Sequence, residues 1–98
     1  MKFFLIHLTY VKPIEVVQEF TDVHRAYLRT QYDQGILLFS GPRVPRTGGV
    51  LFGKADDVAV IEKMIAADPF RTNGVAEYEV IEVAPTTWAP SVAGGFEA

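Results

Sequence analysis

The order in which apolar residues change their spacing is the feature that most constrains the fold of this chain. Short apolar or alternating runs, typical of strands, occupy residues 3–10, 36–40, 50–53 and 75–83. Between the first two runs, and again between the last two, apolar residues recur every three to four positions, which predicts a helix in each interval. The predicted order of elements is therefore β-α-β-β-α-β.

Local signals set the limits of the first predicted helix. Pro13 suits a first helical turn, and Glu15 lies near the positive end of the helix dipole. Helical spacing then continues to about Asp33, and Gly35 ends the helix. The predicted apolar stripe of this helix consists of Val16, Phe20, Val23 and Tyr27.

The second predicted helix lies between two acidic signals. Asp56 is a suitable N-cap, and the helix stops before Asp68-Pro69, because a residue that precedes proline avoids the α region. The run 75–83 that follows alternates apolar with acidic residues, with one break in phase at Val80-Ile81. This pattern predicts a last strand with one polar face.

Residues 36–40 form a continuous apolar run, which predicts a central strand buried on both faces. We expect this strand to continue unevenly to Val44. Turn residues at 46–49 then lead into the shorter strand 50–53, so the two strands pair as a hairpin. Gly53 indicates a bulge or a close approach of the backbone.

The predicted order is that of the ferredoxin-like fold, an α+β antiparallel sheet with both helices on one face. Because the strand at 36–40 is apolar on both sides, the other face of the sheet needs a cover. A second subunit packed sheet against sheet would supply it, so we expect a homodimer that closes a dimeric α/β barrel. We assign residues 1–84 to the domain and residues 85–98 to a C-terminal tail, draped over a neighbour or disordered.

Composition excludes several classes of function. The 98 residues are 49% hydrophobic and 21% charged, which suits one globular domain. The net charge of -3 and the lack of a basic run argue against nucleic acid as a partner. The chain has no cysteine, hence no disulfide, thiolate ligand or cysteine nucleophile. No apolar run approaches the roughly 20 residues of a membrane span, and residues 1–6 fit a strand better than a signal peptide, so we expect a cytoplasmic protein.

His24 is the first candidate catalytic residue. It lies at the edge of the predicted apolar stripe, where the helix meets the sheet. A histidine can transfer protons near neutral pH, but at such a boundary it is also often only a satisfied structural residue. Asp68 can orient a histidine if the fold brings the two together, or it can simply stop the helix and cap backbone donors. Phe70 would then pin this loop against the core.

Ser40-Gly41-Pro42-Arg43 ends the predicted central strand with a hydroxyl, a flexible residue and a cation. These residues can line a pocket and hold an anionic group of a substrate, or form a hairpin turn with a solvated arginine. Arg25 offers the same choice between an anion ligand and a surface ion pair of little value. The two histidines lack metal-ligand spacing, no glycine loop suits a phosphate, and Ser40 lacks the flanks of a nucleophile elbow.

Five features occur in a characteristic order along the chain. They are H-x-x-Y-L beginning at His24, the segment G-I-L-L-F-S-G-P at 35–42, Gly49, D-P-F at 68–70, and Trp88. In these features the chain resembles the YCII-related (YciI-like) family over roughly residues 1–88. The resemblance implies a ferredoxin-like protomer and a homodimeric α/β barrel, related to muconolactone isomerases and small dimeric monooxygenases. The segment 43–46 and the tail depart from the family pattern.

The resemblance also implies roles for individual residues. A His-Asp dyad is the proposed active site of the family, and by motif position it falls on His24 and Asp68, with Ser40, Gly41 and Pro42 beside the pocket. A related enzyme removes chloride from a chlorinated hydroxyquinol, which implies acid/base chemistry without a metal or organic cofactor. Arg43 and Phe70 complete the predicted substrate-binding set.

Two classes of function follow. The first is a lyase, isomerase or dehalogenase that acts on a small organic molecule, with His24 as acid or base and Asp68 holding its tautomer. The second is a noncatalytic module in which the same pocket binds a small molecule or takes part in assembly and the dyad is structural. A structural dimer without any ligand would have no pocket near His24. The distance between the two side chains is the observation that most separates these alternatives.

Overall fold

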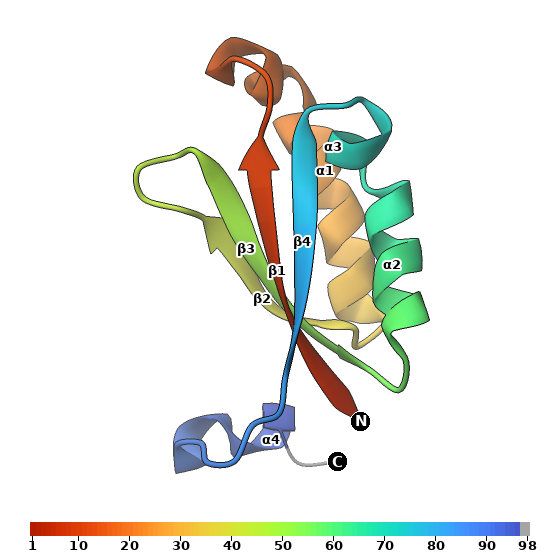
Figure 1. The fold of residues 1–98 in the computed structure, drawn as a ribbon, viewed down its shortest axis with the longest axis vertical. Coiled ribbons are helices and arrows are strands. Elements are labelled where there is room, and N and C mark those ends of the chain that lie inside the picture. The colour runs from red at the N-terminus through yellow and green to blue at the C-terminus, as the bar shows by residue number, and fades with distance from the viewer. Residues whose placement is uncertain (97–98) are drawn as a thin grey trace.

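The computed structural model describes residues 1–96, which form one antiparallel sheet and the helices that pack against it (Figure 1). The order of the main elements agrees with the predicted β-α-β-β-α-β order, with one short additional helix, α3, before the last strand. The elements are β1 (Lys2–Tyr10), α1 (Ile14–Asp33), β2 (Leu37–Pro42), β3 (Gly48–Ala55), α2 (Val58–Ala67), α3 (Pro69–Thr72), β4 (Ala76–Val83), the 3-10 turn η1 (Pro90–Val92) and α4 (Ala93–Phe96).

The sheet has the strand order β2-β3-β1-β4, and every neighbouring pair is antiparallel. Helices α1, α2 and α3 lie together on one face of it (Figure 1). This arrangement confirms the expected α+β ferredoxin-like fold.

The side chains of β1 on one face of the sheet belong to the core, and those on the other face do not. Its side chains alternate between the two faces, and Phe4, Ile6 and Leu8 on the helix side are at most 2% exposed. They pack with the buried side chains of the helices in one core. Phe3 and His7 point to the opposite face, which carries no helix of the domain.

The buried face of α1 differs from the predicted stripe. Val23, expected inside, is 52% exposed, whereas Val17, His24 and Leu28 are buried. His24 therefore lies in the middle of the face that packs on the core, not at its edge. The predicted stripe was shifted from the buried face because apolar residues, Val23 among them, also occur on the exposed side of this helix.

Strand β2 was expected to be central and buried on both faces, and this expectation is wrong. It is an edge strand that pairs only with β3, and Phe39 is 53% exposed. A shift in register between Leu37 and Phe39 interrupts the pairing. Phe39 stacks on Phe52 with ring centroids 5.5 Å apart, on the face without helices. The strand ends at Pro42, before the 97% exposed Val44.

The hairpin of β2 and β3 confirms the predicted pairing, and β3 is longer than the expected run 50–53. A Cβ atom at Gly53 would lie 2.8 Å from the carbonyl oxygen of Ile36, so this glycine permits the expected close approach of the backbone. The apparent break in phase at Val80-Ile81 is not a bulge, because β4 pairs with β1 in continuous register. Val80 instead faces the helices while Ile81 lies on the other face.

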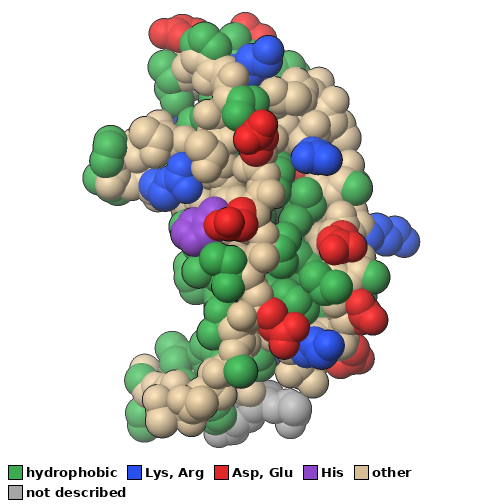
Figure 2. All heavy atoms as spheres, in the orientation of Figure 1, with side chains coloured by type: hydrophobic (Ala, Val, Ile, Leu, Met, Phe, Trp, Pro, Cys, Tyr) green, Lys and Arg blue, Asp and Glu red, His purple; other side chains and the backbone are tan. Residues whose placement is uncertain are grey.

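The face of the sheet that carries no domain helix is partly apolar. Phe96, from the C-terminal segment, packs on Phe3 and Phe52 with centroids 5.2 and 5.9 Å apart. Figure 2 shows hydrophobic side chains gathered around this segment, at the bottom of the view. Elsewhere on the same face Phe39 and Ile81 remain 53% and 42% exposed. Within residues 1–96, no helix combines the length and the apolar character that crossing a bilayer demands.

Candidate active site

The fold brings His24 of α1 and Asp68 of the α2–α3 junction into direct contact. His24 Nδ1 lies 2.7 Å from Asp68 Oδ1, and the two residues are 8% and 1% exposed. Because a carboxylate only accepts hydrogen bonds, Nδ1 carries the proton and donates it to Asp68. The other ring nitrogen, Nε2, is then the atom that can exchange protons with a bound molecule.

Asp68 also has the structural role that its sequence context suggests. It ends α2 in an extended conformation and caps α3, because the same Oδ1 accepts a hydrogen bond of 2.9 Å from the backbone N–H of Phe70. Pro69 occupies the first turn of α3, where its missing N–H costs nothing. One short segment thus fixes the backbone of the carboxylate, and with it the direction of its bond to His24.

Phe70 fixes the plane of the imidazole. Its ring stacks on His24 with centroids 3.9 Å apart and an interplanar angle of 6°. Tyr10 meets the edge of Phe70 at 5.9 Å. The histidine ring is therefore held by a hydrogen bond at one nitrogen and by a parallel aromatic surface on one side.

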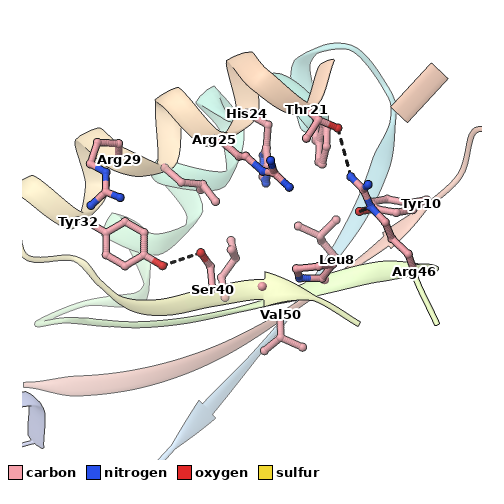
Figure 3. A pocket seen from close by; sticks show the side chains of 16 residues that line it. Leu8, Tyr10, Thr21, His24, Arg25, Arg29, Tyr32, Ser40, Arg46 and Val50 are labelled. Carbon is pink, nitrogen blue, oxygen red and sulfur yellow. Dashed lines mark hydrogen bonds between the residues drawn. The ribbon is translucent and has the colours of Figure 1, made fainter. Parts of the chain in front are cut away.

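His24 borders a cavity of about 460 Å³ between α1 and the sheet (Figure 3). Four of the predicted pocket residues line it with His24, namely Ser40, Gly41, Pro42 and Phe70. Asp68 lies behind the histidine and does not border the cavity. The remaining lining residues are Leu8, Tyr10, Thr21, Arg25, Leu28, Arg29, Tyr32, Arg46, Gly49, Val50 and Leu51.

Arg43, expected beside the pocket, lies outside its lining. Its guanidinium donates to Thr9 Oγ1 at 3.2 Å and to the carbonyl oxygen of Thr47 at 3.3 Å, which ties it to the hairpin. Arg46, three residues further along, takes the place in the lining that the sequence analysis gave to Arg43. The turn between the strands decides which of the two arginines faces the cavity.

Tyr32 is a lining residue that the sequence analysis missed. Its hydroxyl lies 2.6 Å from Ser40 Oγ, so helix and strand are joined across the cavity (Figure 3). Tyr32 is eight positions, or about two helical turns, beyond His24, and this spacing places both on one face of α1. The eight-residue separation from His24 is therefore the sequence feature from which Tyr32 could have been predicted as a lining residue.

Two tyrosines lie near the Asp68 carboxylate. Burial raises the pKa of the Tyr78 phenol far above its ordinary value, and the negative charge of Asp68 raises it further. The Tyr78 hydroxyl is buried without a hydrogen-bond partner among the described residues. Burial first, and Asp68 second, also raise the pKa of Tyr27, whose hydroxyl donates to the carbonyl oxygen of Met64 at 2.7 Å. Both phenols therefore stay neutral around Asp68.

The part of the chain that the structure describes contains no group of three or more His, Cys, Asp or Glu side chains placed to share a metal ion. The imidazole of His24, fixed at the wall of the cavity, can support proton transfer.

Solved structures similar to this chain share its fold. The 5-chloro-2-hydroxyhydroquinone dehydrochlorinase TftG from Burkholderia phenoliruptrix AC1100, in complex with 2,5-dihydroxybenzoquinone, is 21% identical over 86% of this chain and 93% of its own, with a TM-score of 0.69. An antibiotic biosynthesis monooxygenase is 14% identical over 87% of this chain and 99% of its own, with a TM-score of 0.58. No curated protein sequence matches the chain significantly.

The model of one protein family matches most of the chain. It is the YCII-related domain, which aligns with residues 1–84 and so includes both His24 and Asp68. The resemblance seen in the sequence motifs is confirmed, and the chain belongs to the YCII-related domain family.

Proposed function

We propose that this protein is an acid/base enzyme that acts on a small organic molecule, with His24 as the proton-transfer group. The observation that carries the proposal is the 2.7 Å bond between His24 Nδ1 and Asp68 Oδ1 at the wall of a cavity of about 460 Å³. A cavity of this size suits a small ligand. Membership of the YCII-related family agrees with the assignment.

The geometry supports separate tasks for the two residues. Asp68 holds the proton on Nδ1, so Nε2 of the neutral imidazole has a free lone pair and acts as the base. When Nε2 takes a proton, the adjacent carboxylate stabilises the imidazolium that forms. The same nitrogen can then return the proton to another atom of the substrate. A positioned acid/base group of this kind contributes on the order of 10²- to 10⁴-fold in rate, which suits a substrate that is already activated.

The reaction class that we propose is a lyase, isomerase or dehalogenase step. In the form of these reactions that suits the site, a C–H or O–H bond of the substrate breaks and its proton moves to His24. The freed electron pair forms a new π bond in the substrate. In an isomerase step the proton is then returned to another atom, and in a dehalogenase step the halide leaves with the electron pair of its own bond. The name of the similar TftG structure describes a dehydrochlorinase, a reaction that removes a proton and a chloride. Ser40 and Tyr32, bonded to each other at 2.6 Å, supply hydroxyl groups that can orient a polar group of the substrate.

We also propose that the protein is a homodimer that packs through the sheet face carrying Phe39 and Ile81. Both side chains are large, apolar and more than 40% exposed. By the strand register they lie on the side of the sheet opposite to the domain helices. Burial of such a face removes apolar area from water, a favourable change of roughly 25 cal/mol per Å².

Replacement of His24 tests the enzymatic assignment. Purified protein is incubated in D₂O with 5-chloro-2-hydroxyhydroquinone and with a panel of small enolisable acids and ketones, and chloride release and deuterium incorporation are measured. We expect the wild type to turn over at least one of these compounds and His24→Gln to lose at least 10²-fold in rate. His7→Gln is the matched control, because His7 lies on the other face of the sheet and outside the cavity lining.

A specific observation favours the alternative, a noncatalytic small-molecule-binding module. Asp68 caps α3 with the same oxygen that His24 contacts, so the dyad has a structural role even without catalysis. If the wild type binds compounds of the panel but His24→Gln only lowers the melting temperature and leaves every rate unchanged, the alternative is the correct function.

A further inference from the structure

Cations concentrate at the cavity even though the chain is acidic overall. The net charge is -3, yet three arginines and no Asp or Glu are among the residues that line the cavity. Arg25 and Arg29 come from α1, and Arg46 comes from the loop between β2 and β3 (Figure 3). The three cations therefore border the cavity from two sides.

None of these arginines forms an ion pair within the described residues 1–96. Arg25 and Arg29 are one helical turn apart, a spacing at which like charges repel each other and destabilise a helix. Asp22 and Asp33 are close enough in sequence to pair with them, but no carboxylate oxygen of the described residues lies within 4.0 Å of either guanidinium. No salt bridge among residues 1–96 therefore offsets this repulsion.

Neutral groups hold two of the guanidinium groups in place. Arg46 donates to Tyr10 Oη at 3.4 Å and to Thr21 Oγ1 at 3.3 Å. Arg29 lies over the ring of Tyr32, 5.4 Å from its centroid. Because a guanidinium has five N–H donors, these contacts leave donors that can bind an anion.

We propose that the cavity binds a small organic carboxylate, with the carboxylate at Arg25, in the positive potential of Arg29 and Arg46 at the two ends of the cavity, and the reacting carbon at His24 (Figure 3). The proposal rests on the proposed function and adds the class of substrate. Arginine matches the planar, two-oxygen geometry of a carboxylate. The apolar side chains of Leu8, Leu28 and Phe70 give the rest of the ligand an apolar surface.

A carboxylate fits this site better than a phosphate group. Phosphate sites in proteins usually use backbone N–H groups at the start of a helix or in a glycine-rich loop. The lining residues of α1 begin at Thr21, well inside a helix that starts at Ile14. The glycines of the lining, Gly41 and Gly49, belong to paired strands.

The arginines also serve the proposed chemistry. When a C–H bond next to a carbonyl breaks, its proton moves to His24 Nε2, its electron pair forms a C=C bond, and the π pair of the carbonyl moves onto the carbonyl oxygen. A carboxylate on the same molecule makes this second negative charge harder to form. Fixed cations at the cavity offset that repulsion, because groups aimed at developing charge stabilise the transition state.

The test uses benzoate and its neutral analogue benzamide as probes. Binding of each to the full chain is measured by NMR titration at low ionic strength, for the wild type and for Arg25→Gln, Arg29→Gln and Arg46→Gln. The arginines are exposed, so the variants should fold, and melting curves verify this. Lys63→Gln changes the net charge equally at an exposed site on α2 outside the cavity, and it is the matched control.

We expect the wild type and Lys63→Gln to bind benzoate at least 10-fold more tightly than benzamide, Arg25→Gln to lose most of that preference, and Arg29→Gln and Arg46→Gln each to lose part of it. The proposal is overturned if the wild type shows no preference for benzoate, including the case in which neither probe binds. It is also overturned if all three arginine variants keep the preference. His24→Gln separates the two proposals, because it should still prefer benzoate even if the protein turns over no compound at all.

Discussion

At the scale of single residues, the site depends on one oxygen atom with two partners. Asp68 Oδ1 accepts from His24 Nδ1 at 2.7 Å and from the backbone N–H of Phe70 at 2.9 Å. A change of the carboxylate should therefore affect the proposed catalysis and the local stability together, and the choice of substitution separates the two effects.

Asp68→Asn should reduce turnover by 10²-fold or more, with a change in stability of about 1 kcal/mol or less. Asparagine keeps an oxygen for the cap of α3, but it lacks the charge that stabilises an imidazolium. Asp68→Ala should instead lose about 1–3 kcal/mol of unfolding free energy, because two buried donors lose their acceptor. Rates and urea denaturation measure both effects. Turnover of Asp68→Asn within 10-fold of the wild type would contradict the assigned role of the carboxylate.

Tyr78 should make the protein sensitive to alkali. Its pKa in the folded protein is raised above the ordinary value of 10.0, mainly by burial. As the pH rises past about 10, the unfolded chain loses this proton first, so the unfolding free energy falls. Tyr78→Phe should show a weaker fall above pH 10, because phenylalanine has no proton to lose. Parallel curves for variant and wild type between about pH 9 and 11 would contradict this.

At the scale of elements, the capping residues decide where each helix begins and ends. The sequence analysis chose Asp56 as the N-cap of α2, but the structure shows that Asp57 is the cap, because its side chain accepts from the N–H of Ala59 at 2.9 Å. Asp56 instead lies 3.9 Å from the N-terminal amine. Two adjacent aspartates are equally good caps by composition, and only the path of the backbone after β3 separates them.

Asp57→Ala should lower the unfolding free energy by about 1 kcal/mol, the usual value of an N-cap side chain. Asp56→Ala is the matched control and should cost less than about 0.5 kcal/mol, since an exposed ion pair contributes little. Urea denaturation of both variants measures the difference. Equal losses, or a larger loss at Asp56, would show that the cap does not stabilise α2 in solution.

At the scale of the whole molecule, the sheet has two different faces. One face is covered by three helices and contains the core, and the other carries exposed Phe39 and Ile81 on opposite edge strands. The C-terminal segment covers Phe3 and Phe52 between them through Phe96. A partner subunit that packed on Phe39 and Ile81 would bury the rest of this face of the sheet.

Ile81→Lys should convert the proposed dimer into a monomer, because a charge would be buried without a partner. Size-exclusion chromatography with light scattering should give twice the chain mass of 10.9 kDa for the wild type and a single chain mass for the variant. Val44→Lys is the matched control and should remain dimeric, since Val44 is 97% exposed in the loop between β2 and β3, outside the paired strands. A monomeric wild type would contradict the proposed assembly.

The sequence by itself determined the order of the elements, most of their ends and the family motifs. These depend on local physics: residue periodicity, the restriction before Pro69 and the positive φ of 77° at Gly35. Only the tertiary structure decided that β2 is an edge strand, that Arg46 rather than Arg43 lines the cavity, and that His24 contacts Asp68 across 44 positions. A pattern shows which face of an element is apolar, but the neighbour of that face depends on how the whole chain packs.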